Sequence, residues 1–169
     1  VSFSTQNERL KKFVNYVMKE GKKTLAHKLI NATFDILREK GYTNPEEVFD
    51  KAIDNVTPKI ECRPKRVGGA IYQVPTEVPP GRAFALASRW ILAAARGKSG
   101  KDFSVYLAQE FIDAATETGV AVKKKLDVYK MAEANNRHPD RPPHHGRPVA
   151  LMTWMTIFRF EFKFIHSFE

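Results

Sequence analysis

The sequence predicts a mainly α-helical fold, a bundle of about six helices from which a two-stranded β-hairpin arm protrudes. Over most of residues 10–135, apolar side chains recur at the i, i+3, i+4, i+7 spacing of helices with one buried face. The spacing favours β structure only at residues 59–78, which have a Gly-Gly pair at their centre. At 169 residues and 43% hydrophobic content, the chain suits one domain with a sizeable core and is short for two.

Two helices are expected at the start of the chain. The first is ended by Gly21, and its apolar face consists of Leu10, Phe13, Val14, Val17 and Met18. The second begins near Lys23 or Thr24 and ends at Lys40-Gly41. Its apolar face is predicted at Leu25, Leu29, Ile30, Thr33 and Leu37.

The third helix has recognisable start and stop signals. Asn44 is predicted as its N-cap, Pro45 takes the first turn, and Glu47 stands where the acid of a capping box belongs. Pro58 stops the helix. Its buried face is predicted at Val48, Phe49, Ala52, Ile53 and Val56.

Residues 59–78, called the β-arm below, are predicted to form a hairpin. Gly68-Gly69 suits a two-residue type I′ turn, because glycine adopts positive φ at both central positions without strain. Pro64 and Pro75 cannot donate hydrogen bonds to a further strand, so the arm is expected to stay two-stranded. The turn then pairs Val67 with Ala70, Lys65 with Tyr72, and Arg63 with Val74.

The two faces of the β-arm follow from the alternation of side chains along a strand. One face carries Lys59, Arg63, Lys65 and Tyr72, and the other carries Arg66 and Ile71. Arginine and lysine neutralise phosphates, and a tyrosine ring offers a surface on which an unpaired base can stack. The alternative is a solvated hairpin whose glycines serve only the turn.

Three more helices are expected after the β-arm. The fourth spans Arg82–Arg96, with Leu86, Ala87, Trp90 and Ala94 on its inner face. The sixth opens at Asp127 as N-cap and runs through Met131 to about Asn135. The fifth is closed by Gly119, and its apolar residues are Phe103, Leu107, Ala108, Phe111, Ile112 and Ala115.

The composition divides the chain into a domain at 1–136, a Pro/His/Arg linker at 137–148 and an aromatic tail at 149–169. In the tail, charged residues alternate with Phe158, Phe160, Phe162 and Phe164, the period of a strand with one apolar face. We expect this strand to dock on a neighbouring protein or to fold back on its own domain. A poorly ordered tail is the alternative.

The positive charge of the chain is concentrated in two segments. There are 28 Lys and Arg against 19 Asp and Glu, a net charge of +9. Residues 58–102 hold nine cations and three anions, and residues 1–23 hold six and two, whereas residues 24–57 hold four and six. Such zoning predicts a polyanionic partner, either nucleic acid or an anionic membrane surface. No segment reaches the roughly 18 consecutive apolar residues of a membrane span.

Catalytic and metal-binding motifs are weak. The "GKS" at 97–99 lacks the leading glycine of a phosphate loop, because Leu92 stands in its place. His138, His144 and His145 lie in the proline-rich linker, far from Cys62, and are interpreted as solvated. The single cysteine excludes an internal disulfide and fits a reducing compartment. We therefore predict no enzyme, no metal and no cofactor.

Four motifs point to a known family. "KRVGGAIYQVPTEV", "ALASRWILAAAR", "DAATETGVAVKKK" and "MAEAN" closely resemble the small-subunit ribosomal protein numbered seven, in its bacterial and organellar form, from about Arg9 to Asn135. The resemblance implies a structural constituent of the small ribosomal subunit that binds the 3′ major domain of the ribosomal RNA and nucleates head assembly. It also implies that the β-arm reaches toward the messenger-RNA exit and the E-site transfer RNA.

The family motifs carry functional residues onto this chain. Lys65, Arg66, Gly68, Gly69 and Tyr72 match the ribbon of the family, Arg82, Arg89 and Arg96 the basic face of the following helix, and Lys123, Lys124 and Lys125 its lysine run. The lysine run lies next to a predicted helix start, which suits a phosphate contact. The remaining predicted RNA-binding residues are Lys11, Lys12, Lys22, Lys23, Arg63, Lys98 and Lys101.

The two ends of the chain depart from the family. Only "VSFSTQN" precedes the first helix, where the family carries a basic extension, and Asn136-Arg137-His138-Pro139 interrupts the last helix. Contacts made by those ends are not transferred, and the Phe-rich tail is expected to contact neighbouring ribosomal proteins of the head and platform. The start at Val1 and the tail favour a mitochondrial matrix ribosome, with the plastid stroma or a bacterial cytoplasm as alternatives.

An architectural DNA-binding protein with a β-arm is the second hypothesis. Such arms usually insert an apolar or proline wedge between bases, and the tip Val67-Gly68-Gly69-Ala70 makes a weak wedge. An enzyme acting on RNA would need an acid/base or metal set that the sequence lacks.

Overall fold

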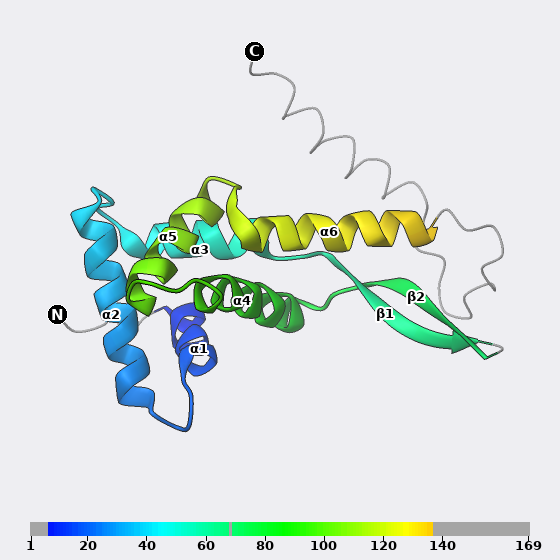
Figure 1. Cartoon of the computed structure of the whole chain (residues 1–169), viewed down its shortest axis with the longest axis horizontal. Helices are drawn as coiled ribbons and strands as arrows, with labels where there is room; N and C mark the ends of the chain where they lie inside the picture. The colour runs from blue at the N-terminus through cyan, green and yellow to red at the C-terminus, as the bar shows by residue number, and fades with distance from the viewer. Residues whose placement is uncertain (1–6, 68, 137–169) are drawn as a thin grey trace, which may run out of the picture. The chain divides into compact units, whose positions relative to one another are not determined.

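The computed structural model describes residues 7–67 and 69–136 of the chain. The predicted linker at 137–148 and the tail with Phe158, Phe160, Phe162 and Phe164 lie outside these residues and stay predictions. The described residues form six helices and one two-stranded sheet, as predicted (Figure 1). The elements are α1 (Glu8–Val17), α2 (Lys23–Glu39), α3 (Pro45–Val56), β1 (Ile60–Val67), β2 (Ala70–Glu77), α4 (Pro80–Arg96), α5 (Phe103–Ala115) and α6 (Gly119–Asn136).

Three fully buried aromatic rings join α1, α3 and α5. The ring centroids of Phe13 and Phe49 are 5.3 Å apart, and those of Phe49 and Phe111 are 5.6 Å apart in a perpendicular arrangement. Phe13 and Phe111 complete the cluster at 5.7 Å. Edge-to-face contacts of this kind add stability beyond the apolar area that they bury. α5 therefore packs at the centre of the helical body, against α2, α3, α4 and α6.

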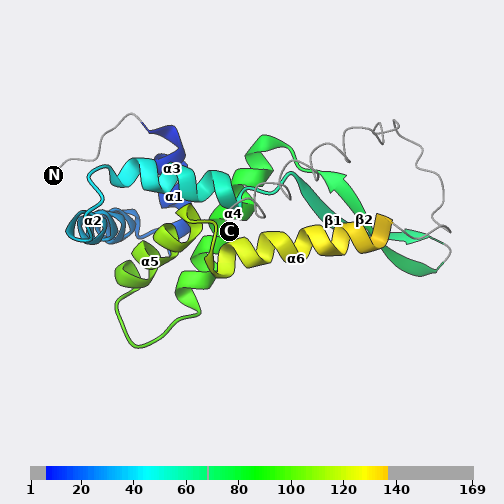
Figure 2. The same cartoon turned by 90° about the horizontal axis from the view of Figure 1, so that it is seen from above.

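The β-arm has the predicted register. Val67 pairs with Ala70, Lys65 with Tyr72, and Arg63 with Val74, and the sheet has only these two antiparallel strands. Gly69 has φ +87°, the value that a type I′ turn needs at its second central position, and Gly68 lies outside the described residues. α6 packs against both strands, and Figure 2 shows it running beside them.

The buried faces of α2 and α4 differ from the predicted ones. Leu25 is exposed, and Ala26 and Phe34 of α2 are buried instead. In α4, which begins at Pro80, Leu86, Trp90 and Ala94 are only partly buried. The fully buried positions of α4 are Ala83, Ala87, Ser88, Ile91, Leu92 and Ala95. The predicted face is thus displaced around the helix from the buried one, in which four of the six positions are alanine or serine.

The helix caps also differ from the prediction. Asn44 is the N-cap residue of α3 and Pro45 lies in its first turn, as predicted, but the Asn44 side chain donates to Glu47 Oε1 at 2.9 Å and makes no hydrogen bond to the backbone of the helix, so the predicted capping box is wrong. Asn7 provides an N-cap that the sequence reading missed. Its Oδ1 accepts from the backbone N–H of Arg9 at 3.0 Å and of Leu10 at 3.3 Å.

α6 begins eight residues before the predicted start at Asp127, so Lys123, Lys124 and Lys125 lie within the helix and not before it. A tight turn joins it to α5, in which the N–H of Thr118 donates to Asp113 O at 2.7 Å. Gly119 completes the turn with φ +91°. The first half of α6 packs on the helical body and the second half on the β-arm, so no single apolar stripe marks the helix in the sequence.

We expect Gly119→Ala to destabilise the protein, because the substitution forces an L-residue into the left-handed region and places its Cβ 2.9 Å from Asp113 Cβ. Strain of this kind lowers the free energy of unfolding by about 1–3 kcal/mol. Urea denaturation followed by circular dichroism measures the effect. Gly81→Ala is the control, because open space surrounds Gly81. Equal denaturation midpoints for the two variants would contradict the prediction.

Candidate nucleic-acid interface

Three arginines form a line along the exposed side of α4. Arg82, Arg89 and Arg96 follow one another at intervals of seven residues, and all three are exposed. Seven residues are almost two turns of an α-helix, so consecutive arginines differ by only about 20° around the axis and about 10.5 Å along it. The predicted basic face of this helix is therefore present as a stripe of about 21 Å.

The two outer arginines of this stripe also hold neighbouring elements. Arg96 Nη2 donates to the carbonyl oxygen of Val17 at 3.1 Å, and the guanidinium lies 6.0 Å from the ring centroid of Phe103. Arg82 bonds to Glu61 of β1. Arg89 has no hydrogen bond or ion pair among the residues that the structure describes. Of the three, Arg89 is the one whose guanidinium is entirely available to a partner.

Glu61 bonds to two arginines at the base of the β-arm. Arg82 Nε lies 2.8 Å from both carboxylate oxygens, and Arg63 Nε donates to Oε1. The Glu61 side chain is only 10% exposed, whereas those of Arg63 and Arg82 are about half exposed. Burial alone raises the pKa of Glu61, but the hydrogen bonds and charges of Arg82 and Arg63 outweigh it and hold the pKa below its usual value.

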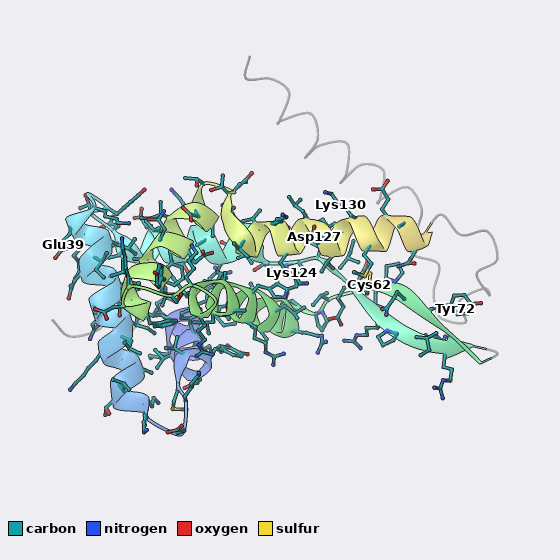
Figure 3. All side chains as sticks on the ribbon, in the orientation of Figure 1. Glu39, Cys62, Tyr72, Lys124, Asp127 and Lys130 are labelled. Carbon is teal, nitrogen blue, oxygen red and sulfur yellow. The ribbon has the colours of Figure 1, made fainter. Side chains whose placement is uncertain are left out.

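α6 holds the other side of the arm's base. The Tyr129 hydroxyl accepts the backbone N–H of Lys59 at 3.0 Å, and Cys62 Sγ lies 4.0 Å from the carbonyl oxygen of Val128. Figure 3 places Cys62 at this junction and Tyr72 farther out along the arm. The base of the β-arm is thus fixed between the first turn of α4 and the middle of α6.

The outer part of the β-arm presents free cations. Lys65 and Arg66 are exposed and have no ion pair among the described residues. Tyr72, 46% exposed, is paired with Lys65 across the ladder, and Ile71, 62% exposed, is paired with Arg66. In this outer part, each face of the arm therefore carries one cation beside one large exposed side chain. This arrangement can neutralise phosphate and stack on a base.

The loop between α4 and α5 contains two predicted contact residues, Lys98 and Lys101, and their surroundings differ. Lys98 forms an ion pair of 2.5 Å with Glu110, a side chain that is 1% exposed. The hydrogen bond with Glu110 raises the pKa of Lys98 most, against an opposing effect of burial. Lys101 is exposed and has no such partner in the described part of the chain. Lys98 therefore stabilises the fold, and Lys101 is free.

The predicted lysines of α1, α2 and α6 divide in the same way. Lys22 pairs with Glu20 at 2.7 Å. Lys125 donates to Asn55 O at 3.1 Å and lies 5.6 Å from the Tyr129 ring centroid, so it ties α6 to α3. Among the predicted lysines of these helices, those that are exposed and have no ion pair in the described residues are Lys11, Lys12, Lys23, Lys123 and Lys124.

Sequence reasoning missed Glu61 and Tyr129. The alternation of the strand did place Glu61 on the same face as Arg63, and an acid among cations was a usable signal. No comparable signal marked Tyr129, since its partner is a backbone N–H 70 residues away in the sequence.

The described residues offer no group of three or more His, Cys, Asp or Glu that could hold a metal ion. Within the same ranges, no helix has both the length and the apolar content to cross a membrane. The described surface carries exposed guanidinium and ammonium groups on the helices and on the β-arm, together with the exposed Tyr72, and this suits the binding of a polyanion.

A helical body with a basic two-stranded arm suits a structural nucleic-acid-binding protein. Residues 2–136 match the family "Ribosomal protein S7p/S5e". The chain belongs to this family, as its motifs predicted, and the family is structural and not enzymatic.

Curated relatives agree with the family match. The chain is 55% identical over 127 residues to the small ribosomal subunit protein uS7 of Kosmotoga olearia, covering 75% of this chain and 82% of the relative. It is 53% identical over 124 residues to uS7 of Thermotoga maritima, covering 73% and 80%. It is 53% identical over 129 residues to uS7 of a Thermoanaerobacter species, covering 76% and 83%.

We expect Lys98→Met to lower the free energy of unfolding by about 2–3 kcal/mol, because it leaves the buried Glu110 carboxylate without its partner. Adding Glu110→Gln should restore much of the loss, since the uncompensated charge is then gone. Lys101→Met is the matched control and should change stability by less than about 0.5 kcal/mol. Urea denaturation at neutral pH measures all three variants. A loss no larger for Lys98→Met than for Lys101→Met would contradict a structural role.

The depressed pKa of Glu61 predicts a pH-dependent stability. The carboxyl contributes at pH values above its unfolded pKa of 4.5, and the contribution is lost as pH falls through the lower folded pKa. Glu61→Gln should therefore be less stable than the parent by about 1–2 kcal/mol near neutral pH. The gap should close in acid. Urea denaturation over the range from neutral pH to about 3 checks this against Glu77→Gln, a change at an exposed acid. A stability difference between Glu61→Gln and the parent that does not change with pH would contradict the prediction.

Proposed function

We propose that this chain, a structural constituent of the small ribosomal subunit, binds the small-subunit ribosomal RNA directly through the β-arm and the basic stripe of α4. The single observation that carries the proposal is the arrangement of Lys65, Arg66 and Tyr72, which are exposed on a ribbon whose base is fixed to the helices. A fixed base keeps the entropy cost of presenting these groups low.

The proposed binding has two components. The free cations neutralise backbone phosphates and release counterions, which supplies affinity that falls with salt. Tyr72 stacks on an unpaired base. Of the predicted residues, we assign direct phosphate contact to the unpaired cations: Lys11, Lys12, Lys23, Lys65, Arg66, Arg89, Lys101, Lys123 and Lys124. Lys22, Lys98, Arg96 and Lys125 support the surface through their own contacts, and Gly69 lies in the turn of the arm.

The finer contacts follow from the family resemblance and from the shape of the arm. We propose that the RNA partner is the 3′ major domain and that binding nucleates the subunit head. The β-arm extends beyond the helices, so its tip is the part that can reach the messenger-RNA exit and the E-site transfer RNA. Neighbouring ribosomal proteins of the head and platform are proposed as partners of the Phe-rich tail.

The ribosome is the proposed location, and its compartment is a separate point. The three relatives compared above are bacterial. They give no support to a mitochondrial matrix over a bacterial cytoplasm or a plastid stroma, and the mitochondrial location stays a prediction. Membership of a ribosomal family decides against the architectural DNA-binding hypothesis.

We expect Lys65→Ala/Arg66→Ala to weaken binding to a transcript of the 3′ major domain of bacterial small-subunit RNA. The slope of log affinity against log salt should fall by about 1–2, because two phosphate contacts are lost. Filter binding over a series of salt concentrations measures the slope. Lys28→Ala/Lys51→Ala removes the same charge from exposed positions of α2 and α3 in the acidic segment and should leave the slope nearly unchanged.

Two outcomes would contradict the proposal. The first is an equal change of slope in both double variants, which would mean that overall charge and not the β-arm governs binding. The second is tighter binding of the parent chain to duplex DNA than to the transcript at the same salt concentration.

A further inference from the structure

The Glu61 cluster leaves the outer ends of both its arginines available. Each guanidinium uses Nε to bond the buried carboxylate, and the described residues provide no further partner for the Nη groups of Arg63 or Arg82. Both side chains are about half exposed. Two guanidinium groups from separate elements, β1 and α4, thus lie side by side with their remaining N–H donors free.

Two adjacent guanidinium groups need a compensating negative charge, because like charges repel. The buried Glu61 carboxylate between them provides this charge, and its depressed pKa keeps it ionised near neutral pH. Arg82 also lies in the first turn of α4, where the helix dipole is positive. The free donors of two adjacent guanidinium forks match the oxygens of a phosphate group.

We propose that Glu61 is a positioning residue for RNA binding: it orders Arg63 and Arg82 as a pair for the phosphodiester backbone and so strengthens binding despite its own negative charge. This inference rests on the proposed function of the chain as an RNA-binding protein and adds a buried acid to that site. The arginines touch the phosphate, and Glu61 acts through them.

The proposal and simple electrostatics predict opposite changes in RNA affinity for one substitution. Glu61→Gln removes a negative charge beside the interface, so Coulomb attraction alone predicts tighter RNA binding. Positioning predicts weaker binding, because glutamine has an NH2 donor in place of the second acceptor oxygen beside Arg82 and lacks the negative charge that holds the two guanidinium groups together. The two arginines must then be ordered at the moment of binding, which costs about a tenfold loss of affinity for two such side chains.

The experiment measures binding of the full chain to the 3′ major domain transcript by filter binding over a series of salt concentrations. We expect Glu61→Gln to raise Kd about tenfold and to leave the salt slope nearly unchanged, because both arginines still contact phosphate in the complex. Glu77→Gln, one position along the ladder on an exposed side chain, is the charge-matched control and should leave Kd unchanged or lower it. Tighter binding by Glu61→Gln, or an equal loss in Glu77→Gln, would overturn the proposal.

A second comparison separates positioning from a general loss of stability. In an Arg63→Gln/Arg82→Gln background, Glu61 has no arginines to position, so Glu61→Gln should leave Kd unchanged or lower it. A tenfold loss in that background as well would mean that Glu61 merely stabilises the fold, and the proposal would fail. If this background does not fold, as judged by circular dichroism at the assay temperature, Arg63→Gln alone replaces it. The loss caused by Glu61→Gln must then be clearly smaller than in the parent.

Failure of this inference is distinguishable from failure of the proposed function. If the parent binds the transcript and Lys65→Ala/Arg66→Ala weakens it while Glu61→Gln does not, the function stands and the role of Glu61 is wrong. If the parent itself does not bind the transcript, the proposed function fails, and the inference fails with it.

Discussion

A two-stranded ribbon has no core of its own, so the β-arm depends on the helices that hold its base. Glu61 bonds to Arg82 of α4 on one side, and the backbone of Lys59 bonds to Tyr129 of α6 on the other. α4 and α6 are in turn packed against α5, whose Phe111 joins the buried aromatic cluster. α5 therefore sets the position of the arm indirectly, through its packing against α4 and α6.

The same constraint explains why the cations of this protein fall into two groups. Lys98 and Lys125 lie at the junctions of helices, where each satisfies a buried carboxylate or a helix-end carbonyl. Lys65, Arg66 and Arg89 lie where no element of the described structure packs over them. Net charge counts all of these residues as equal, whereas their contacts within the protein show that only part of the excess positive charge is left exposed and unpaired in the described residues.

Local sequence signals were enough to predict the register of the β-arm but not to predict where the helices begin and end. Gly68-Gly69 and the two-residue period gave the register of the β-arm, because a hairpin is built from neighbours in sequence. The start of α6 was missed because its burial changes from the helical body to the arm along its length, so no periodic stripe marks it. Glu61 was missed as a site residue because its second partner, Arg82, is 21 residues away in the sequence.

Pro64 and Pro75 have a consequence for the protein before it meets its partner. The outer edge of each strand of a ribbon is a row of backbone donors and acceptors to which another chain can add. Pro64 in β1 and Pro75 in β2 remove a donor from each strand, and the charges of Arg63, Lys65 and Arg66 repel the arm of a second copy. In the unbound protein the ribbon therefore stays extended and accessible, and it resists pairing with the ribbon of a second copy.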